Sequence, residues 1–311
     1  MKLAIVYAGQ GSQKVGMGRD FYEKYPSFRA LLDGADAGFD VKELCFEGAE
    51  ERLSQTRYTQ PCMVAFAMGV TDLLFEAGIR PQAAAGLSLG EYSALYCAGV
   101  FDKETALQTV ALRGRAMEEA ARGLECGMTA VLGLDREKLQ QACQEASQLG
   151  VVQICNYNCP GQLVISGEKA AVDKAGELAK ELGAKRCMPL KVSGPFHTGL
   201  MKPAGDALAE HFTKICFGEM EVPVYFNCKG APMGEGDTIP ALLERQVQSS
   251  VYWEDTIRAM EADGIDTIVE IGPGKTLSSF VKKTAPSIKT YNIDTAEDFL
   301  KVTAALKGEA L

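Results

Sequence analysis

The sequence predicts an α/β fold with a parallel sheet, into which a smaller domain with its own sheet is inserted. Short apolar runs at residues 3–8, 83–87 and 267–271 lead into glycine-containing turns, and helical patterns alternate with them. Strand, loop and helix repeated in this way are typical of parallel sheets. Residues 128–190 read instead as strand, helix, strand, strand, helix, strand. That βαββαβ order is the ferredoxin-like unit.

The elements of the larger domain follow from apolar spacing. Residues 3–8, LAIVYA, precede GQGSQ, which predicts a buried strand and a tight loop. Residues 60–78 are apolar on most sides, which predicts a buried helix. A helix follows the weak strand at 83–87, and the next helix has Asp102 as its N-cap and runs to about Ala121.

The prediction of the small domain rests on shorter segments. Asp135 is placed to cap its first helix and Gly183 to close its second. We predict strands at 128–134, 151–158, 162–167 and 184–190, and helices at 135–149 and 168–183. The predicted domains are therefore a core formed by residues 1–126 and 191–311 and a small subdomain at 127–190.

Composition limits the classes of function. The chain has 311 residues, 47% hydrophobic and 23% charged, which is typical of a globular protein of about two domains. The net charge of −9 argues against nucleic acid or an anionic membrane as a partner. No apolar run has the length of a membrane span, and the N-terminal run is too short for a signal peptide, so we expect a cytoplasmic protein. Two histidines and ten scattered cysteines predict no metal site.

Two glycine-rich segments resemble nucleotide-binding motifs but do not complete them. GQGSQKVGMG has Lys14 where a dinucleotide motif needs its third glycine. EIGPGKTL has Val269 where a P-loop needs its first glycine. Both are interpreted as turns between a strand and a helix, and His211, among helix formers, as a residue on a helix surface.

The segment GLSLG, centred on Ser88, indicates nucleophilic chemistry. A small-residue strand precedes it and a helix follows, which is the context of a nucleophile elbow. The N–H of Leu89 would then face an oxyanion. The alternative is a serine that only caps the helix. A serine nucleophile needs a base, and the turn-rich VSGPFHTGLM offers His197, whose alternative is a solvated loop residue.

Seven segments occur in the order found in the malonyl/acyl transferase family of fatty-acid and polyketide synthesis. They are GQGSQ, GLSLGEYSAL, LRGRAM, NYNCPGQLVISG, SGPFHTGLM, QSSVYW and EIGPGKTL, and the resemblance spans about residues 3 to 285. It implies an α/β-hydrolase-like core with a ferredoxin-like insert. It also implies the activity of a malonyl-CoA:acyl-carrier-protein transacylase. Such an enzyme moves malonyl from malonyl-CoA to the phosphopantetheine thiol of acyl carrier protein through a Ser–His acyl-enzyme.

The resemblance assigns roles to individual residues. By it, Ser88 is the acylated nucleophile and His197 its base, and Arg113 binds the malonyl carboxylate. The other implied roles are the oxyanion-hole N–H groups of Gln10 and Leu89, the histidine-orienting carbonyl of Gln246, and acyl-site asparagines at Asn156 and Asn158. No bound cofactor is implied, because coenzyme A enters as a thioester substrate. The chain departs from the family pattern at Leu87, where a histidine usually precedes the serine, which leaves the tuning of acyl selectivity open.

The sequence leaves three alternative hypotheses for the function. An esterase of the α/β-hydrolase class would need a carboxylate between serine and histidine in the chain, and Asp135 and Asp173 are the candidates. A non-catalytic subunit would bind acyl carrier protein without needing Ser88 or His197. A polyketide-type loader would take another extender unit, against which GPFH, with a bulky Phe196, resembles the malonyl-type form.

Overall fold

The structure is a computed structural model that describes residues 1–309. Its strands are β1 (Leu3–Tyr7), β2 (Ala83–Gly86), β3 (Cys126–Leu132), β4 (Val152–Cys159), β5 (Gln162–Glu168), β6 (Arg186–Pro189), β7 (Val224–Tyr225), β8 (Thr267–Ile271) and β9 (Lys289–Ile293). Its first helices are α1 (Arg19–Lys24), α2 (Pro26–Asp33), α3 (Val41–Glu47), α4 (Glu50–Leu53), α5 (Thr56–Glu76), α6 (Gly90–Cys97) and α7 (Lys103–Ala121). The later ones are α8 (Arg136–Ala146), α9 (Lys169–Glu181), α10 (Lys202–Phe212), α11 (Ile239–Gln248), α12 (Trp253–Ala262), α13 (Thr276–Thr284) and α14 (Ala296–Lys307).

The chain divides into two compact units. The first unit holds Met1–Gly114, Ile215–Tyr225 and the residues from Met260 onward, and the second holds Arg115–Lys214 and Phe226–Ala259. The second unit includes the segment that the sequence predicts as a small domain. It also includes α10 and α11, which pack against each other.

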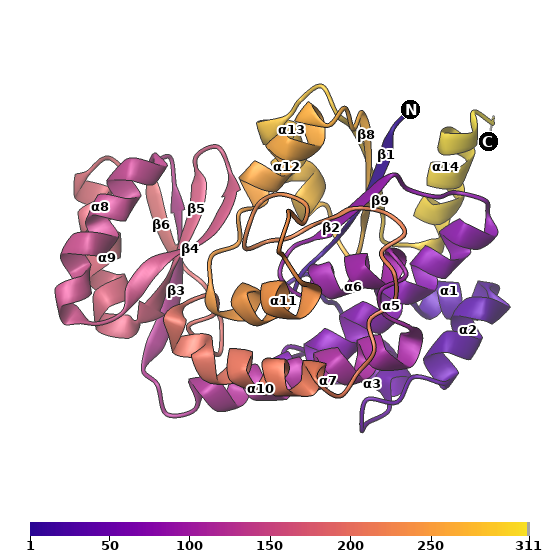
Figure 1. The fold of residues 1–311 in the computed structure, drawn as a ribbon, viewed down its shortest axis with the longest axis horizontal. Helices are drawn as coiled ribbons and strands as arrows, with labels where there is room; N and C mark the ends of the chain where they lie inside the picture. The colour runs from indigo at the N-terminus through magenta and orange to yellow at the C-terminus, as the bar shows by residue number, and fades with distance from the viewer. Residues whose placement is uncertain (310–311) are drawn as a thin grey trace. The chain divides into compact units, whose positions relative to one another are not determined.

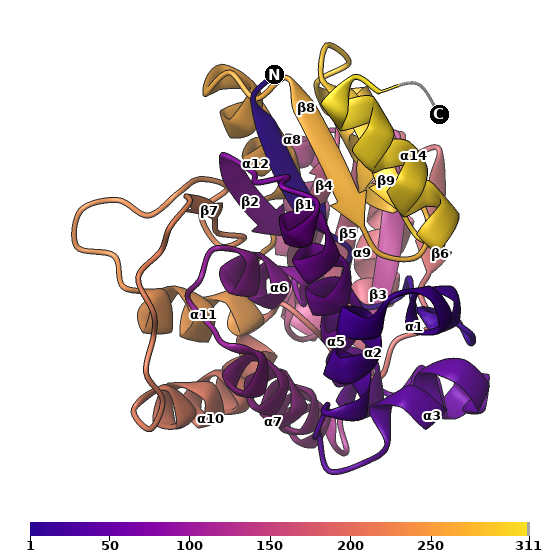
Figure 2. The same cartoon turned by 90° about the vertical axis from the view of Figure 1, so that its right-hand side faces the viewer.

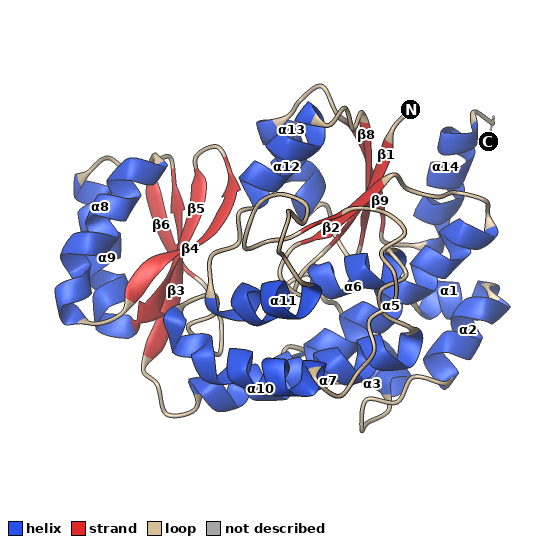
Figure 3. Ribbon diagram, viewed as in Figure 1, coloured by secondary structure: helices blue, strands red, loops and turns tan. Residues whose placement is uncertain are grey.

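A parallel sheet forms the centre of the first unit (Figures 1 and 3). Its strand order is β7-β2-β1-β8-β9. All four neighbouring pairs are parallel, and Ile5 in β1 lies opposite Ala84 in β2 and Val269 in β8. Every residue of β1, β2 and β8 is buried, as expected of parallel strands covered on both faces. Helix α6 packs on β1 and β2, and α14 lies beside β9 (Figure 2). The predicted α/β class is confirmed.

An antiparallel sheet forms the second unit's own layer, with strand order β4-β5-β3-β6. In chain order its elements are β3, α8, β4, β5, α9 and β6, so the predicted βαββαβ order is confirmed. Helices α8 and α9 lie side by side on one face (Figure 3). Their apolar stripes bury a core against the sheet that includes Val131, Leu139, Ile154, Leu163, Ile165, Val172 and Leu178.

Several boundaries differ from the prediction. The buried helix predicted at 60–78 begins earlier, at Thr56, and carries Pro61 within it. The helix predicted to reach residue 149 ends at Ala146, and a 3₁₀ turn, Ser147–Leu149, continues it. Both predicted N-caps are confirmed: Asp102 accepts from the N–H of Thr105 at 2.7 Å, and the side chain of Asp135 caps α8 in the same way.

Candidate functional site

Ser88 lies in the turn between β2 and α6, in a backbone conformation that is rare for a side-chain-bearing residue. Its φ is 54°, and among residues 1–309 the other non-glycine residue with positive φ is His197, at 60°. Such conformations cost about 1–3 kcal/mol each and persist where the surrounding structure enforces them. The two residues that the sequence predicts as nucleophile and base are therefore the two non-glycine residues that the fold holds at positive φ.

The glycines on either side of Ser88 are required by close backbone contacts. A Cβ on Gly86 would lie 1.9 Å from the carbonyl carbon of Gly90, and a Cβ on Gly90 would lie 2.2 Å from the carbonyl oxygen of Tyr7. No side chain fits at those distances. The sharp turn between β2 and α6 therefore requires glycine two residues before and two residues after Ser88, which explains the GxSxG spacing.

The loop after β1 runs directly against this turn. Because β1 and β2 are parallel, their carboxyl ends meet at one edge of the sheet. A Cβ on Gly9 would lie only 2.5 Å from the carbonyl oxygen of Leu87, and the Gln10 side chain donates to Thr56 Oγ1 at 3.0 Å. Within residues 1–309, the backbone N–H groups of Gln10 and Leu89 donate no hydrogen bond to another backbone group. Leu89 also stands at the N-terminus of α6, where the helix dipole favours negative charge.

Arg113 is placed beside the serine hydroxyl. Its guanidinium, on α7, is fully buried, and Nη2 donates to Ser88 Oγ at 3.2 Å. Burial lowers the pKa of Arg113, while Tyr92 and Glu91 act in the opposite direction. The next residue, Gly114, lets α7 approach the start of α5, since a Cβ there would lie 2.8 Å from the Cα of Arg57.

His197 lies in the second unit, buried in the segment between β6 and α10. Its Nδ1 is 3.0 Å from the carbonyl oxygen of Gln246 and 3.2 Å from that of Ser249. A carbonyl only accepts, so Nδ1 carries the proton and Nε2 is the basic nitrogen. Both carbonyls stand at the C-terminal end of α11, where helix C=O groups lack intrahelical partners and the dipole favours a cation.

Two residues of this arrangement escaped the sequence analysis. Ser249 acts through its backbone carbonyl, which a pattern of side chains does not predict. Gln153 on β4 donates to the carbonyl of His197 at 3.1 Å. Strand β4 also fixes the segment that carries Ser249, because Val251 donates to the carbonyl of Cys155 at 2.8 Å. For Gln153, the feature of the sequence that could have suggested a role is a polar glutamine within the apolar run of β4.

The predicted asparagines are buried on the same strand. Asn156 lies at an irregularity in the β4–β5 register and accepts a hydrogen bond from Cys155 Sγ at 3.3 Å. Asn158 Oδ1 is buried and has no hydrogen-bond partner within the described residues. Their place in the acyl site stays a prediction.

The carboxylates that an esterase would need are engaged elsewhere. Asp135 accepts from the N–H of Lys138 at 2.8 Å as the cap of α8. Asp173 pairs with Lys169 at 2.6 Å on the exposed side of α9. The groups 3.0 and 3.2 Å from His197 Nδ1 are instead the backbone carbonyls of Gln246 and Ser249.

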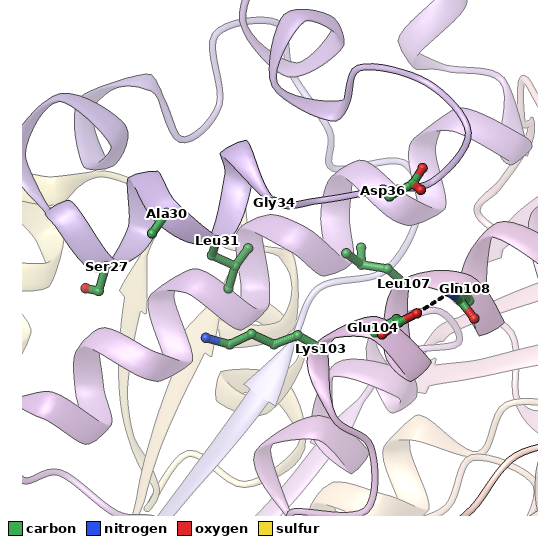
Figure 4. A pocket seen from close by; sticks show the side chains of 9 residues that line it. All are labelled: Ser27, Ala30, Leu31, Gly34, Asp36, Lys103, Glu104, Leu107 and Gln108. Carbon is green, nitrogen blue, oxygen red and sulfur yellow. Dashed lines mark hydrogen bonds between the residues drawn. The ribbon is translucent and has the colours of Figure 1, made fainter.

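A cavity of about 480 Å³ opens elsewhere on the first unit, between α2 and the start of α7 (Figure 4). Its walls mix Ser27, Asp36, Lys103, Glu104 and Gln108 with apolar side chains, and it holds none of the predicted site residues. Across residues 1–309, no three His, Cys, Asp or Glu side chains are grouped as metal ligands would be. No helix in that range has both the length and the apolar character needed to cross a bilayer.

Comparison with known proteins agrees with this geometry. Residues 4–301 match the model of the acyl transferase domain family. The malonyl CoA-acyl carrier protein transacylase of Bacillus subtilis is 43% identical over 99% of this chain and 98% of its own length. A crystal structure of malonyl CoA-acyl carrier protein transacylase from Clostridium perfringens is 38% identical, covers 99% of this chain and 98% of that one, and superposes with a TM-score of 0.94.

A second solved structure contains a carrier. It is a malonyl-transacylase in complex with its type II PKS acyl-carrier protein, 38% identical, with a TM-score of 0.94 and coverage of 99% of this chain and 100% of that chain. The family model and these relatives each span nearly the whole length of the sequence. The chain belongs to the acyl transferase domain family.

Proposed function

We propose that the chain is a malonyl-CoA:acyl-carrier-protein transacylase, an S-malonyltransferase that supplies malonyl groups for fatty-acid synthesis. The curated relatives carry that name, and one related structure contains a carrier protein. The observation that carries the proposal is the fully buried Arg113, whose Nη2 lies 3.2 Å from the hydroxyl of the strained Ser88. A buried cation beside a nucleophile favours an acyl group that brings its own carboxylate.

The mechanism that we propose is a two-step transfer. Ser88 Oγ attacks the thioester carbonyl while His197 Nε2 takes its proton. The oxyanion is bonded by the N–H groups of Gln10 and Leu89. As the tetrahedral intermediate collapses, coenzyme A leaves and takes the proton from the histidine. The phosphopantetheine thiol of the carrier then attacks the serine ester by the same steps, and the serine regains its hydrogen. These steps use only the chain's own groups and the two thiols, so no bound cofactor enters them.

Two helix ends support the charges that these steps create. The N-terminus of α6 follows Ser88 and favours the oxyanion, and the C-terminus of α11 meets His197 and favours the imidazolium. A carbonyl orients the histidine where hydrolases use a carboxylate. We propose that this makes His197 a milder base, which suits a thiol acceptor better than water.

The carrier and the protein are both acidic, so their contact needs a local positive surface. We propose that it includes Lys185, Arg186 and Lys191, which are exposed on and beside β6. Met188 and Leu190, also exposed there, add apolar area. We also propose that the protein acts in the cytoplasm, where coenzyme A thioesters and the carrier protein would both be available to it.

The proposal is tested by measuring two reactions side by side. The protein should move malonyl from malonyl-CoA to carrier protein bearing phosphopantetheine, followed by the mass of the carrier, and should hydrolyse p-nitrophenyl acetate slowly. Fast ester hydrolysis with no malonyl-carrier product would indicate an esterase. Carrier binding without transfer would indicate a non-catalytic subunit.

A further inference from the structure

Tyr92 is a buried aromatic residue to which the proposed chemistry gives no role, although it contacts Arg113. It lies on α6, four residues after Ser88, and is fully buried. The guanidinium carbon of Arg113 is 5.2 Å from the centroid of the Tyr92 ring. That is within the range of about 6 Å in which an aromatic face attracts a cation.

The ring is fixed from within the first unit. Tyr92 stacks on Phe101 with a centroid distance of 6.3 Å and an interplanar angle of 7°, and Phe101 contacts Phe217 at 5.5 Å. Burial raises the pKa of the Tyr92 phenol, so the ring that meets Arg113 is neutral. The contact is therefore between a neutral ring and a fully buried cation.

A neutral ring is a suitable partner for a cation that must bind an anionic substrate. The buried Glu91 already places one negative charge near Arg113. A second carboxylate in place of Tyr92 would compete with the acyl carboxylate for the N–H donors of the guanidinium. An aromatic face attracts the guanidinium without competing as an anion. It also limits the rotamers of a long side chain, so that less freedom is lost when substrate binds.

We propose that Tyr92 is a specificity-determining residue, which holds the Arg113 guanidinium within reach of Ser88 Oγ and so favours dicarboxylic over monocarboxylic acyl donors. Tyr92 acts through Arg113 and is a positioning residue. The inference rests on the proposed function, because it concerns the choice of acyl donor at Ser88.

The test compares acyl donors in Tyr92→Phe, Tyr92→Leu and Tyr96→Leu. Tyr96 is a matched control on the same helix, since its hydroxyl donates to Asp72 at 2.6 Å. Rates of acylation by malonyl-CoA and acetyl-CoA are measured by intact mass, with Tm as a check on folding. Losing a desolvated ring contact should lower the malonyl:acetyl rate ratio about 30-fold in Tyr92→Leu. Tyr92→Phe keeps the ring and should stay within about 3-fold of wild type, and Tyr96→Leu should not change the ratio.

Fluorinated phenylalanines at position 92 cover the case in which Tyr92→Leu does not fold. They keep the ring's shape while fluorine withdraws charge from its face, so the ratio should fall stepwise with each added fluorine. A ratio that stays constant across the series, or a Tyr92→Phe variant as impaired as Tyr92→Leu, overturns the inference. A wild-type protein that malonyl-CoA does not acylate would instead contradict the proposed function itself.

Discussion

Replacing Arg113 with alanine should remove the preference for malonyl-CoA that the proposed function implies. The guanidinium is fully buried and donates to Ser88 Oγ at 3.2 Å, so a carboxylate that binds there forms a desolvated charge pair with it. Removing one partner of a desolvated charge pair typically costs about 2–5 kcal/mol. At about 1.4 kcal/mol per factor of ten, kcat/KM for malonyl-CoA should fall roughly 30- to 4,000-fold. Acetyl-CoA carries no such carboxylate, and its kcat/KM should hold or rise.

The assay follows coenzyme A release from both donors with wild type, Arg113→Ala, Arg113→Lys and Arg115→Ala. Arg115 is exposed two residues further along α7 and serves as the matched control, with no selective loss expected. Lysine keeps the charge but not the two-point fork, so Arg113→Lys should lie between wild type and Arg113→Ala. If both donors decline together in Arg113→Ala, the arginine is structural. If the selective loss appears in Arg115→Ala instead, the carboxylate site has been misplaced.

Three further predictions concern the base, the turn and the carrier. His197→Ala should slow transfer roughly 10²- to 10⁴-fold, while His211→Ala, on α10, should be nearly neutral; equal rates for the two variants would show that the base is misassigned. Gly90→Ala should lower the free energy of unfolding by about 1–3 kcal/mol, because the added Cβ would lie 2.2 Å from the carbonyl oxygen of Tyr7. Urea denaturation measures this change, and an unchanged midpoint would contradict that contact. KM for the carrier should rise with salt more than KM for free pantetheine, and parallel salt curves would argue against the basic surface beside β6.

The parts of the fold with strong sequence patterns were predictable. The strands β1, β2 and β8 are short apolar or small-residue runs that end in glycine-containing turns, and the caps Asp102 and Asp135 stand where the helical patterns begin. Strand β7 has only two residues and β9 is half exposed, so neither shows an apolar run or a period of two. The helices α11 and α12 were not predicted from residue patterns either, although each is amphipathic.

Candidate site residues could be predicted where the proposed chemistry depends on side chains, and not where it depends on backbone groups. Ser88 and His197 could be proposed as nucleophile and base because a serine between two glycines is a specific pattern and the chain has only two histidines. The carbonyl of Ser249 and the left-handed conformation of His197 leave no trace in residue type. The contact between Tyr92 and Arg113 joins two helices and depends on how closely α6 and α7 pack.

Formation of a covalent malonyl-enzyme at Ser88 is the most direct test of the central claim. The protein is incubated with malonyl-CoA, and its intact mass and the acylated peptide are determined, with Ser88→Ala as the control. We expect one malonyl group per wild-type chain, mapped to Ser88, and no added mass in Ser88→Ala. A label carried by a cysteine, or equal labelling of the two proteins, would contradict it.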